Sequence, residues 1–316
     1  MSSAICQLTP LPVLRAAELQ QTVSQQQWLI ETLWTQCGVG LVGGTPKSLK
    51  TWLALELAVS VASGTACLGR FAVQRKGFAL IYLAEDQPCD VRQRLQHLCQ
   101  YRDVAMQQLD VLVITEPTLR LDNQCDIERL DATLAAYKPT LLLLDPFVRL
   151  HRANENDAQE VARILASLRQ LQRQHHCAVV VVHHTRKNHR CSQHGQALRG
   201  SGDFHAWADS ALYLNHTSNG MLQLNIEHRS AAAPEPLYLR LVGQPPHPAI
   251  VQPDDSPQSS VEQRVLQSLQ HSQTPMRRTA LRQLLTINNQ RLGQALESLE
   301  KAGSIERTDL GWSVQQ

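Results

Sequence analysis

Short apolar runs alternate with longer amphipathic segments along most of the chain. Runs of four to six apolar residues are typical of strands buried on both faces of a parallel sheet. Apolar residues at helical spacing indicate helices packed on that sheet, so the alternation predicts an α/β fold with a mostly parallel, doubly wound sheet. The predicted strands are 39–42, 78–83, 111–114, 141–145 and 178–182, and the predicted helices are 52–62, 91–100, 127–137 and 158–175.

The pattern changes after residue 205. Apolar or alternating stretches at 211–214, 221–226 and 237–241, with turn residues between them, predict antiparallel strands that extend the sheet. The following stretch, 244–260, contains five prolines among Ser, Asp and Gln residues. Because this stretch has little to bury, it is predicted to be a linker.

The last segment, 261–316, predicts a small domain of its own. Apolar residues recur at helical spacing over 261–270, 278–285 and 288–302, and two short strands follow. Three helices and a hairpin in this order are typical of a winged helix-turn-helix domain, which binds DNA through its third helix in many proteins and docks a protein in others. Both alternatives stay open, and Arg291 on the third helix is the candidate DNA contact.

The chain of 316 residues exceeds what one hydrophobic core usually spans, so more than one domain is expected. The predicted organisation is a large α/β domain at 1–243, the linker at 244–260 and the winged helix-turn-helix domain at 261–316. The large domain begins with a Gln- and Leu-rich lead-in, 1–37, in which 25–34 favours a short amphipathic helix.

Charge and cysteine content limit the partners and the compartment. The formal net charge is +2, so nucleic-acid binding would depend on local patches rather than on a global field. The eight cysteines are scattered without a C-x-x-C pair, and no basic segment followed by a long apolar run opens the chain. No apolar stretch approaches the ~20 residues of a membrane helix. We therefore expect a cytoplasmic protein with no membrane partner.

A glycine-rich stretch separates the first predicted strand from the first predicted helix. Such a turn leaves backbone N–H groups facing one spot, with the positive end of the helix dipole behind them, and phosphate binds at such a spot. In the template G-x-x-x-x-G-K-[ST], Lys50 reaches the β- and γ-phosphates and the Thr51 hydroxyl binds Mg²⁺. Leu49 replaces the second glycine, so an ordinary Gly-rich turn is the alternative. The predicted site for ATP comprises Gly44, Thr45, Pro46, Lys47, Ser48, Leu49, Lys50 and Thr51.

Polar side chains follow three more predicted strands. Glu85 and Asp86 follow one strand, Asp145 ends another as in a Walker B motif, and His183 and His184 follow a third. Because parallel strands present their carboxyl ends at one edge of the sheet, these side chains are expected near the phosphate loop. A helix N-cap pair is the alternative for the first two carboxylates, and a metal site is the alternative for the two histidines.

Phosphoryl transfer needs a cation clamp, a bound Mg²⁺, a carboxylate that orients water and a sensor of the γ-phosphate. Lys50 is the candidate clamp, and Thr51 and Asp145 are the candidate Mg²⁺ ligands. Glu85 is the candidate water-orienting base, with Asp86 as its nearest rival. The candidate sensor is His184.

These motifs together resemble the RecA-like ATPase core of RepA-type hexameric plasmid helicases. The similarity covers about residues 25–243 and is carried by 44–63, Ala84-Glu85-Asp86, Leu144-Asp145-Pro146, 183–187 and Leu198-Arg199-Gly200-Ser201. The resemblance implies a ring of identical subunits with ATP at each interface, the loop Lys, Thr, Glu and Asp acting in cis and Arg199 acting from the neighbour. It also implies that His184 rather than His183 is the sensor. Leu49 departs from the family pattern, so weak hydrolysis is an open alternative.

Two groups of basic residues are expected at the same edge of the sheet. One follows the Walker B strand and the other lies in the polar stretch 185–202, which also contains Arg199 and is too long for a tight turn. A ring could use them to bind the phosphates of a single DNA strand, although solvated surface charge explains each group equally well. An ion pair with Asp203 or Asp209 is the alternative for Arg199. The candidate DNA contacts are Arg149, Arg152, Arg186, Lys187 and Arg190.

Two functions follow from these observations. The first is a DNA-dependent ATPase that works as a ring-forming replicative DNA helicase of a plasmid or other mobile element. It would hold single-stranded DNA in a central channel and would bind duplex DNA through the winged helix. The second is an ATP-dependent DNA-binding adaptor or switch with weak hydrolysis.

Overall fold

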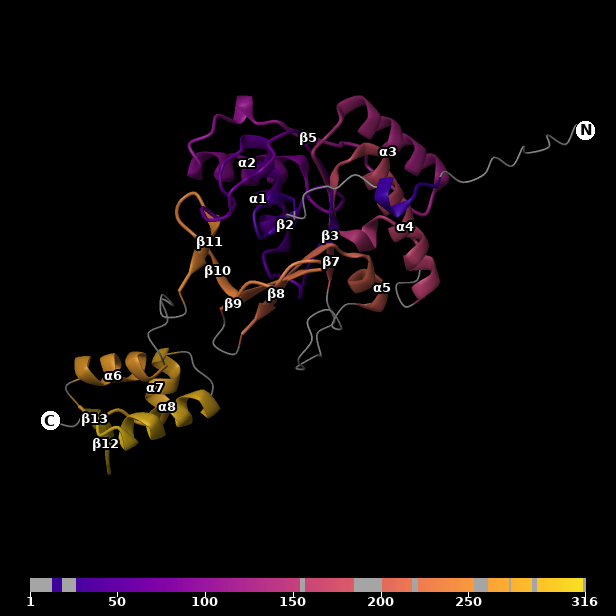
Figure 1. Cartoon of the computed structure of the whole chain (residues 1–316). Coiled ribbons are helices and arrows are strands. Elements are labelled where there is room, and N and C mark those ends of the chain that lie inside the picture. The colour runs from indigo at the N-terminus through magenta and orange to yellow at the C-terminus, as the bar shows by residue number, and fades with distance from the viewer. Residues whose placement is uncertain are drawn as a thin grey trace, which may run out of the picture. The chain divides into compact units, whose positions relative to one another are not determined.

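The computed structural model describes residues 13–18, 27–153, 157–184, 201–217, 221–252, 261–272, 274–285 and 289–314. The chain divides into two compact units, Met1–Ile250 and Val251–Gln316 (Figure 1). None of the helices in the described ranges combines the length and apolar character needed to cross a membrane.

Within the described part of the larger unit, nine strands form a single sheet. The six strands from β8 to β5 pair in parallel, whereas β9 runs antiparallel to β8 and β10 runs antiparallel to β9. The spatial order is β11 (His247–Val251), β10 (Leu237–Val242), β9 (Leu222–His228), β8 (Ser210–His216), β3 (Val39–Gly44), β7 (Ala178–His184), β6 (Leu141–Asp145), β4 (Ala79–Leu83) and β5 (Val111–Val113).

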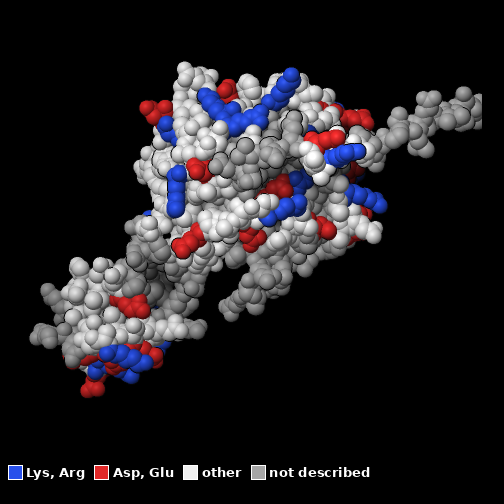
Figure 2. All heavy atoms as spheres, in the orientation of Figure 1, with Lys and Arg blue, Asp and Glu red and all other residues white. Residues whose placement is uncertain are grey.

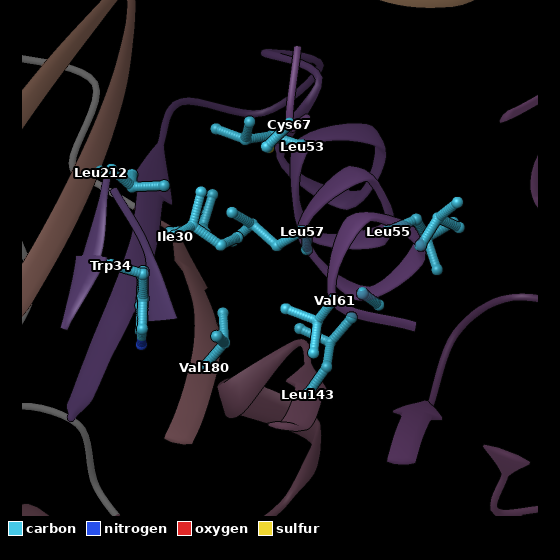
Figure 3. Packing of buried hydrophobic residues seen from close by; sticks show 14 of the residues in the cluster. Ile30, Trp34, Leu53, Leu55, Leu57, Val61, Cys67, Leu143, Val180 and Leu212 are labelled. Carbon is cyan, nitrogen blue, oxygen red and sulfur yellow. The ribbon is translucent and has the colours of Figure 1, made fainter. Parts of the chain in front are cut away.

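Helices cover both faces of this sheet, and each face has its own hydrophobic core. The period of two along a strand divides the side chains between the cores: Val180 and Val182 pack with α1 and α2, whereas Val179 and Val181 pack with α3, α4 and α5. Figure 3 shows α1 side chains in the first of these cores. The helices are α1 (Lys50–Ser63), α2 (Pro88–Tyr101), α3 (Gln124–Tyr137), α4 (Ala158–His175) and α5 (Ser201–Trp207), with short 3-10 turns η1 (Ala16–Glu18), η2 (Met106–Gln108) and η3 (Phe147–Arg149).

A buried ion pair fixes α1, the helix that follows the glycine-rich loop. Glu56 on α1 pairs with Arg102, which caps the end of α2, and the two side chains are 0% and 3% exposed. The Glu56 carboxylate also accepts a hydrogen bond from the backbone N–H of Leu68, and Arg102 donates to the Ser60 hydroxyl. These partners compensate for the removal of two charges from water, so α1 and α2 are joined by a network in which losing either partner would leave a buried charge.

In its described part, residues 27–34, the segment 25–34 does not form the helix expected from its pattern. It contains β1 (Trp28–Ile30) and begins β2 (Trp34–Thr35), which pair antiparallel across a turn. Leu29, Ile30, Leu33 and Trp34 are at most 1% exposed and join the core around α1. Their spacing of i, i+1, i+4 and i+5 matches one face of a helix, but here a turn between two short strands produces it.

Two further expectations about the sheet need correction. The strand at 211–214 was expected to be antiparallel, yet β8 is parallel to β3, with Gly40 opposite Ser210, and only its other edge is antiparallel. The prediction of a linker at 244–260 is wrong for 247–251, which form β11. Because β11 lies at the edge of the sheet, Pro248 is tolerated there although it cannot donate a backbone hydrogen bond.

The smaller unit contains the three helices and the hairpin that the sequence predicts. Among the described residues, its core is formed by these elements and includes Val265, Leu281, Leu296 and Ile305, with Met276 packed against it. The elements are α6 (Val261–His271), α7 (Arg278–Leu285), α8 (Asn289–Lys301), β12 (Ile305–Thr308) and β13 (Gly311–Val314).

Deleting residues 261–316 should leave the larger unit folded. The two units have separate hydrophobic cores, so truncation should expose little apolar surface in the part that remains. We expect the melting temperature of the core transition to change by less than about 3 °C, the shift that corresponds to roughly 1 kcal/mol at this size. Circular dichroism melts of the truncated and full-length proteins measure this, with the isolated fragment 251–316 as the complementary sample. Loss of the folded state on truncation would show that the smaller unit is integral to the fold.

Candidate functional site

The glycine-rich loop returns tightly on itself between β3 and α1. A Cβ atom added to Gly44 would lie 2.6 Å from the hydroxyl of Ser48 and 2.6 Å from the carbonyl oxygen of Leu214, so this position accepts only glycine without rearrangement. The helix α1 begins at Lys50 without a side-chain cap on its first turn. The N–H groups of a first turn have no partners within their helix, so the loop and helix together form a site suited to an anion.

Three buried oxygens at this site have no hydrogen-bond partner among the described residues: Thr45 Oγ1, Ser48 Oγ and Asp145 Oδ2. Buried polar atoms are nearly always paired in folded proteins, so such a group calls for a ligand or a water. Hydroxyl groups can donate to phosphate oxygens, and a carboxylate oxygen is a preferred ligand of Mg²⁺. The residues at this site therefore fit a Mg²⁺–nucleotide phosphate group.

The Lys50 side chain folds back over the loop. Its Nζ atom donates a hydrogen bond to the carbonyl oxygen of Thr45 at 2.7 Å, and the residue is 6% exposed. Burial lowers the pKa of Lys50 to about 8, and the nearby charge of Asp145 opposes this shift. A buried ammonium group with one carbonyl partner is an electrostatic cost that a phosphate anion would offset.

Asp145 ends β6, two strands away from the loop, and is 5% exposed. Thr51, the other predicted Mg²⁺ ligand, follows Lys50 on the first turn of α1. Burial raises the pKa of Asp145 to about 6, the Thr51 side chain opposes this shift, and the charge of Asp86 raises the pKa further. Lys50 also opposes the shift, and Glu85 adds to it.

The raised pKa of Asp145 predicts a pH dependence of stability. Between about pH 4 and pH 6 the folded chain binds more protons at this carboxyl than the unfolded chain, so its contribution to the unfolding free energy falls as the pH rises. A shift from 3.8 to about 6 corresponds to a change of the order of 3 kcal/mol across this window. Urea unfolding at several pH values should show this slope in the wild type and not in Asp145→Asn. The exposed Asp90→Asn is the control, and an identical slope in wild type and Asp145→Asn would contradict the prediction.

Leu49 occupies the left-handed region of backbone conformation, with φ 60° and ψ 20°, as the N-cap of α1. This region favours glycine because a Cβ atom is strained there. The position at which the loop template has glycine thus keeps a conformation that suits glycine, although the residue is leucine. The Leu49 side chain packs against the core around α1, which offsets part of the strain.

Replacing Leu49 by glycine separates these two effects. Glycine removes a backbone strain of about 1–2 kcal/mol but loses the packing of a partly buried leucine, so the change in unfolding free energy should be within about 1 kcal/mol of zero. If the side chain hinders phosphate, nucleotide affinity should rise. If the loop has adapted around the side chain, affinity should stay the same or fall. Titration with a fluorescent ATP analogue measures this, and Leu49→Ala, which keeps the strain without the packing, should be the least stable of the three proteins.

The two histidines at the end of β7 point to opposite faces of the sheet. His183 is 1% exposed and stacks on Phe204, with ring centroids 4.5 Å apart, in the core below α4 and α5. His184 belongs to the alternate set of side chains, on the α1 face, and its Cα is paired with that of Gly44. His184 is thus the histidine on the face that carries the loop. Within the described ranges, no three His, Cys, Asp or Glu side chains are grouped to hold a metal ion.

Each of the two candidate bases forms an ion pair with an arginine. Glu85 Oε1 accepts a hydrogen bond from Arg149 Nε at 2.6 Å, and the two side chains are 47% and 63% exposed. Asp86 pairs with Arg94 of α2 at 2.8 Å, with side chains 22% and 27% exposed. Both carboxylates lie at the end of β4, whose Leu83 is opposite Asp145. Sequence reasoning missed both arginine partners because each pair joins separate elements and leaves no local pattern.

Arg149, a candidate DNA contact, is paired with Glu85. Arg152 is exposed, and its backbone N–H donates to Asp122 at 2.8 Å. The other predicted DNA contacts of the larger unit, Arg186, Lys187 and Arg190, lie outside the described residues, as does Arg199. Arg291 is in α8, and its side chain is also outside the described set.

Asp209 is one of the two alternative partners considered for Arg199. It accepts a hydrogen bond from the backbone N–H of Val39 and forms ion pairs with Arg169 and Arg229. Both of its oxygens therefore already have partners among the described residues, which weakens this alternative.

A family model described as an AAA domain matches residues 6–190. Among solved structures, the chain is similar to the ATPase domain of G40P, with 14% sequence identity and a TM-score of 0.52 over 69% of this chain and 86% of that chain. It is also similar to a KaiC-like protein from Pyrococcus horikoshii, with 13% identity and a TM-score of 0.49 over 71% of this chain and 94% of that one.

Proposed function

Because the chain belongs to the AAA domain family, we propose that its RecA-like P-loop core is a DNA-stimulated ATPase that works as a ring-forming DNA helicase. The observation that carries the ATPase part is that the buried oxygens of Thr45, Ser48 and Asp145 have no partner among the described residues, at the loop whose Thr45 carbonyl accepts a hydrogen bond from Lys50. This arrangement matches the cation clamp and metal ligands that phosphoryl transfer requires.

Each residue of the site has a separate proposed role in hydrolysis. Thr51 and Asp145 would hold Mg²⁺, which neutralises charge on the β- and γ-phosphates when it is bound. When nucleotide binds, the Lys50 ammonium donates to a phosphate oxygen instead of to the Thr45 carbonyl. The hydroxyls of Thr45 and Ser48 also donate hydrogen bonds to phosphate. Glu85 orients the attacking water.

The sensor and the arginine complete the proposed site. His184, on the α1 face beside Gly44, is the group that responds to the γ-phosphate. Arg199 of a neighbouring subunit stabilises the charge that develops on the equatorial oxygens. A shared site of this kind requires a head-to-tail interface between identical subunits, and we propose that these interfaces close into a hexameric ring.

Single-stranded DNA is the proposed track of this ring. Figure 2 shows basic and acidic side chains interspersed on the visible face of the larger unit, so DNA contacts depend on a local set of cations rather than on the overall charge. The proposed set is Arg149, Arg152, Arg186, Lys187 and Arg190.

The smaller unit is proposed to be a winged helix that binds duplex DNA, with Arg291 and Gln294 on α8 as the contacts. A second function, an ATP-dependent adaptor with weak hydrolysis, is favoured by two observations. Leu310 at the turn of the hairpin is 66% exposed, which suits a protein partner better than a phosphate backbone. Leu49 in the left-handed conformation also departs from an efficient phosphate loop.

Measurement of turnover distinguishes the two functions. Purified full-length protein is assayed for ATP hydrolysis with and without single-stranded DNA, and for unwinding of a forked duplex. A helicase should show DNA-stimulated hydrolysis and ATP-dependent unwinding, both lost in Lys50→Ala. An adaptor should bind ATP and DNA without unwinding. Absence of nucleotide binding would refute both.

A further inference from the structure

Glu85, the proposed water-orienting base, and Arg149, a proposed DNA contact, are joined to each other. The Arg149 Nε atom donates to Glu85 Oε1 at 2.6 Å. The Glu85 carboxylate, which is proposed to orient water, is therefore bound to the Arg149 guanidinium, which is proposed to bind DNA phosphate. Neither residue can take up its proposed role without weakening this pair.

The side chains are free to part, whereas the backbone that carries Arg149 is fixed. The neighbouring Phe147 is fully buried. The Arg120 guanidinium donates to the carbonyl oxygens of Arg149 and His151, at 2.5 Å and 3.3 Å. The Glu85–Arg149 pair itself is 47% and 63% exposed, and exposed ion pairs contribute little to stability. A competing phosphate can therefore displace the carboxylate without moving the chain.

The neighbouring pair of Asp86 and Arg94 differs in this respect. Its side chains are less exposed, at 22% and 27%, and the Arg94 guanidinium lies over the ring of Trp52, 5.9 Å from its centroid. Arg94 thus has a second contact that keeps it in place. Of the two carboxylates at the end of β4, Glu85 is therefore the one whose arginine partner is more accessible to a ligand from solution.

We propose that Arg149 is a positioning residue that holds Glu85 away from its water-orienting role, and that a phosphate of single-stranded DNA releases Glu85 by taking Arg149. This inference rests on the proposed ATPase function of the same site. It gives a physical reason for DNA stimulation: the bound strand changes the partner of Arg149 and thereby frees the carboxylate.

The first test measures binding of oligo(dT) by fluorescence anisotropy and does not depend on turnover. Glu85→Gln should tighten binding about two- to fivefold, because Arg149 no longer has to leave a carboxylate. Arg149→Ala should weaken binding and reduce the slope of log K against log salt by about 0.7, the value for one phosphate contact on a single strand. In the Arg149→Ala background, Glu85→Gln should have no effect, since the two changes remove the same interaction.

Glu116→Gln is the matched control. It removes one charge from another exposed pair, Glu116–Arg129, whose side chains are 36% and 54% exposed, at the end of the edge strand β5. We expect no change in oligo(dT) affinity for this variant. If Glu85→Gln tightens binding equally in the wild type and in Arg149→Ala, the gain comes from general charge and the proposal is overturned.

The second test measures ATP hydrolysis. Arg149→Ala should raise DNA-free turnover about two- to fivefold and abolish further stimulation by oligo(dT), because Glu85 is already released. Equal loss of turnover with and without DNA would show that Arg149 positions Glu85 productively and would overturn the proposal. Absence of turnover in the wild type would refute the proposed ATPase, and the binding cycle would still decide whether the pair is displaced by phosphate.

Discussion

Replacement of Lys50 by alanine should lower ATP turnover by about 10²–10³ or more, the cost of removing one preorganised charge partner from a developing oxyanion. Lys50 is 6% exposed and donates to the Thr45 carbonyl within the loop, so it can reach a phosphate bound there with little rearrangement. Steady-state hydrolysis and equilibrium binding of an ATP analogue measure the effect. Unchanged hydrolysis in this variant would refute the phosphate-loop assignment.

A companion variant shows that this loss is not caused by unfolding. Burial lowers the pKa of Lys50 to about 8, which means that the folded chain without nucleotide is less stable with the ammonium charged than it would be with a neutral side chain. Lys50→Met keeps the apolar stem without the charge, so its melting temperature should equal or exceed that of the wild type while activity is lost. The exposed Lys76→Ala should change neither quantity.

Elements with an unambiguous apolar pattern could be predicted from the sequence. The strand 141–145 and the helix 158–175 have the predicted bounds. Four leucines followed by Asp indicate a buried strand, and a long amphipathic segment indicates a helix, so neither pattern leaves an alternative. The prediction of a helix at 25–34 was wrong because a turn between two short strands places buried residues at helical spacing. The strand at 247–251 was missed because a segment rich in proline was predicted to be a linker, although proline can occupy an edge strand.

The relative positions of the site residues could be predicted from a general rule of parallel sheets, whereas the contacts between their side chains could not. The carboxyl ends of parallel strands meet at one edge, which brought Lys50, Thr51 and Asp145 together. The partner of Glu85 lies 64 residues away in the sequence, and no local spacing marks such a pair. The backbone conformation of Leu49 was likewise hidden, since its residue type gives no sign of a left-handed conformation.

Arg199→Ala should lower turnover by about 10³–10⁵ while nucleotide affinity changes much less, as is typical of an arginine finger. Arg199 lies outside the described residues, but the described residues on both sides of 185–200 lie near the site. On its N-terminal side the last described residue is His184 of β7, which is paired with Gly44 of the phosphate loop, and on its C-terminal side the chain is described again from α5. Of its alternative partners, Asp209 is already paired with Arg169 and Arg229.

Mixing variants decides whether this arginine acts within its own subunit or on the neighbour. Arg199→Ala subunits keep the phosphate loop, and Lys50→Ala subunits keep the arginine, so a mixed ring contains interfaces in which both groups are intact. In a random equal mixture about one interface in four has this combination, and hydrolysis should recover to at most about a quarter of the wild-type rate if the interfaces act independently. An arginine that acts in cis predicts no recovery, because every subunit then lacks one of the two groups. Mixed rings shown by differential tagging to form and yet remain inactive would remove the main support for a shared site and would favour the adaptor over the helicase.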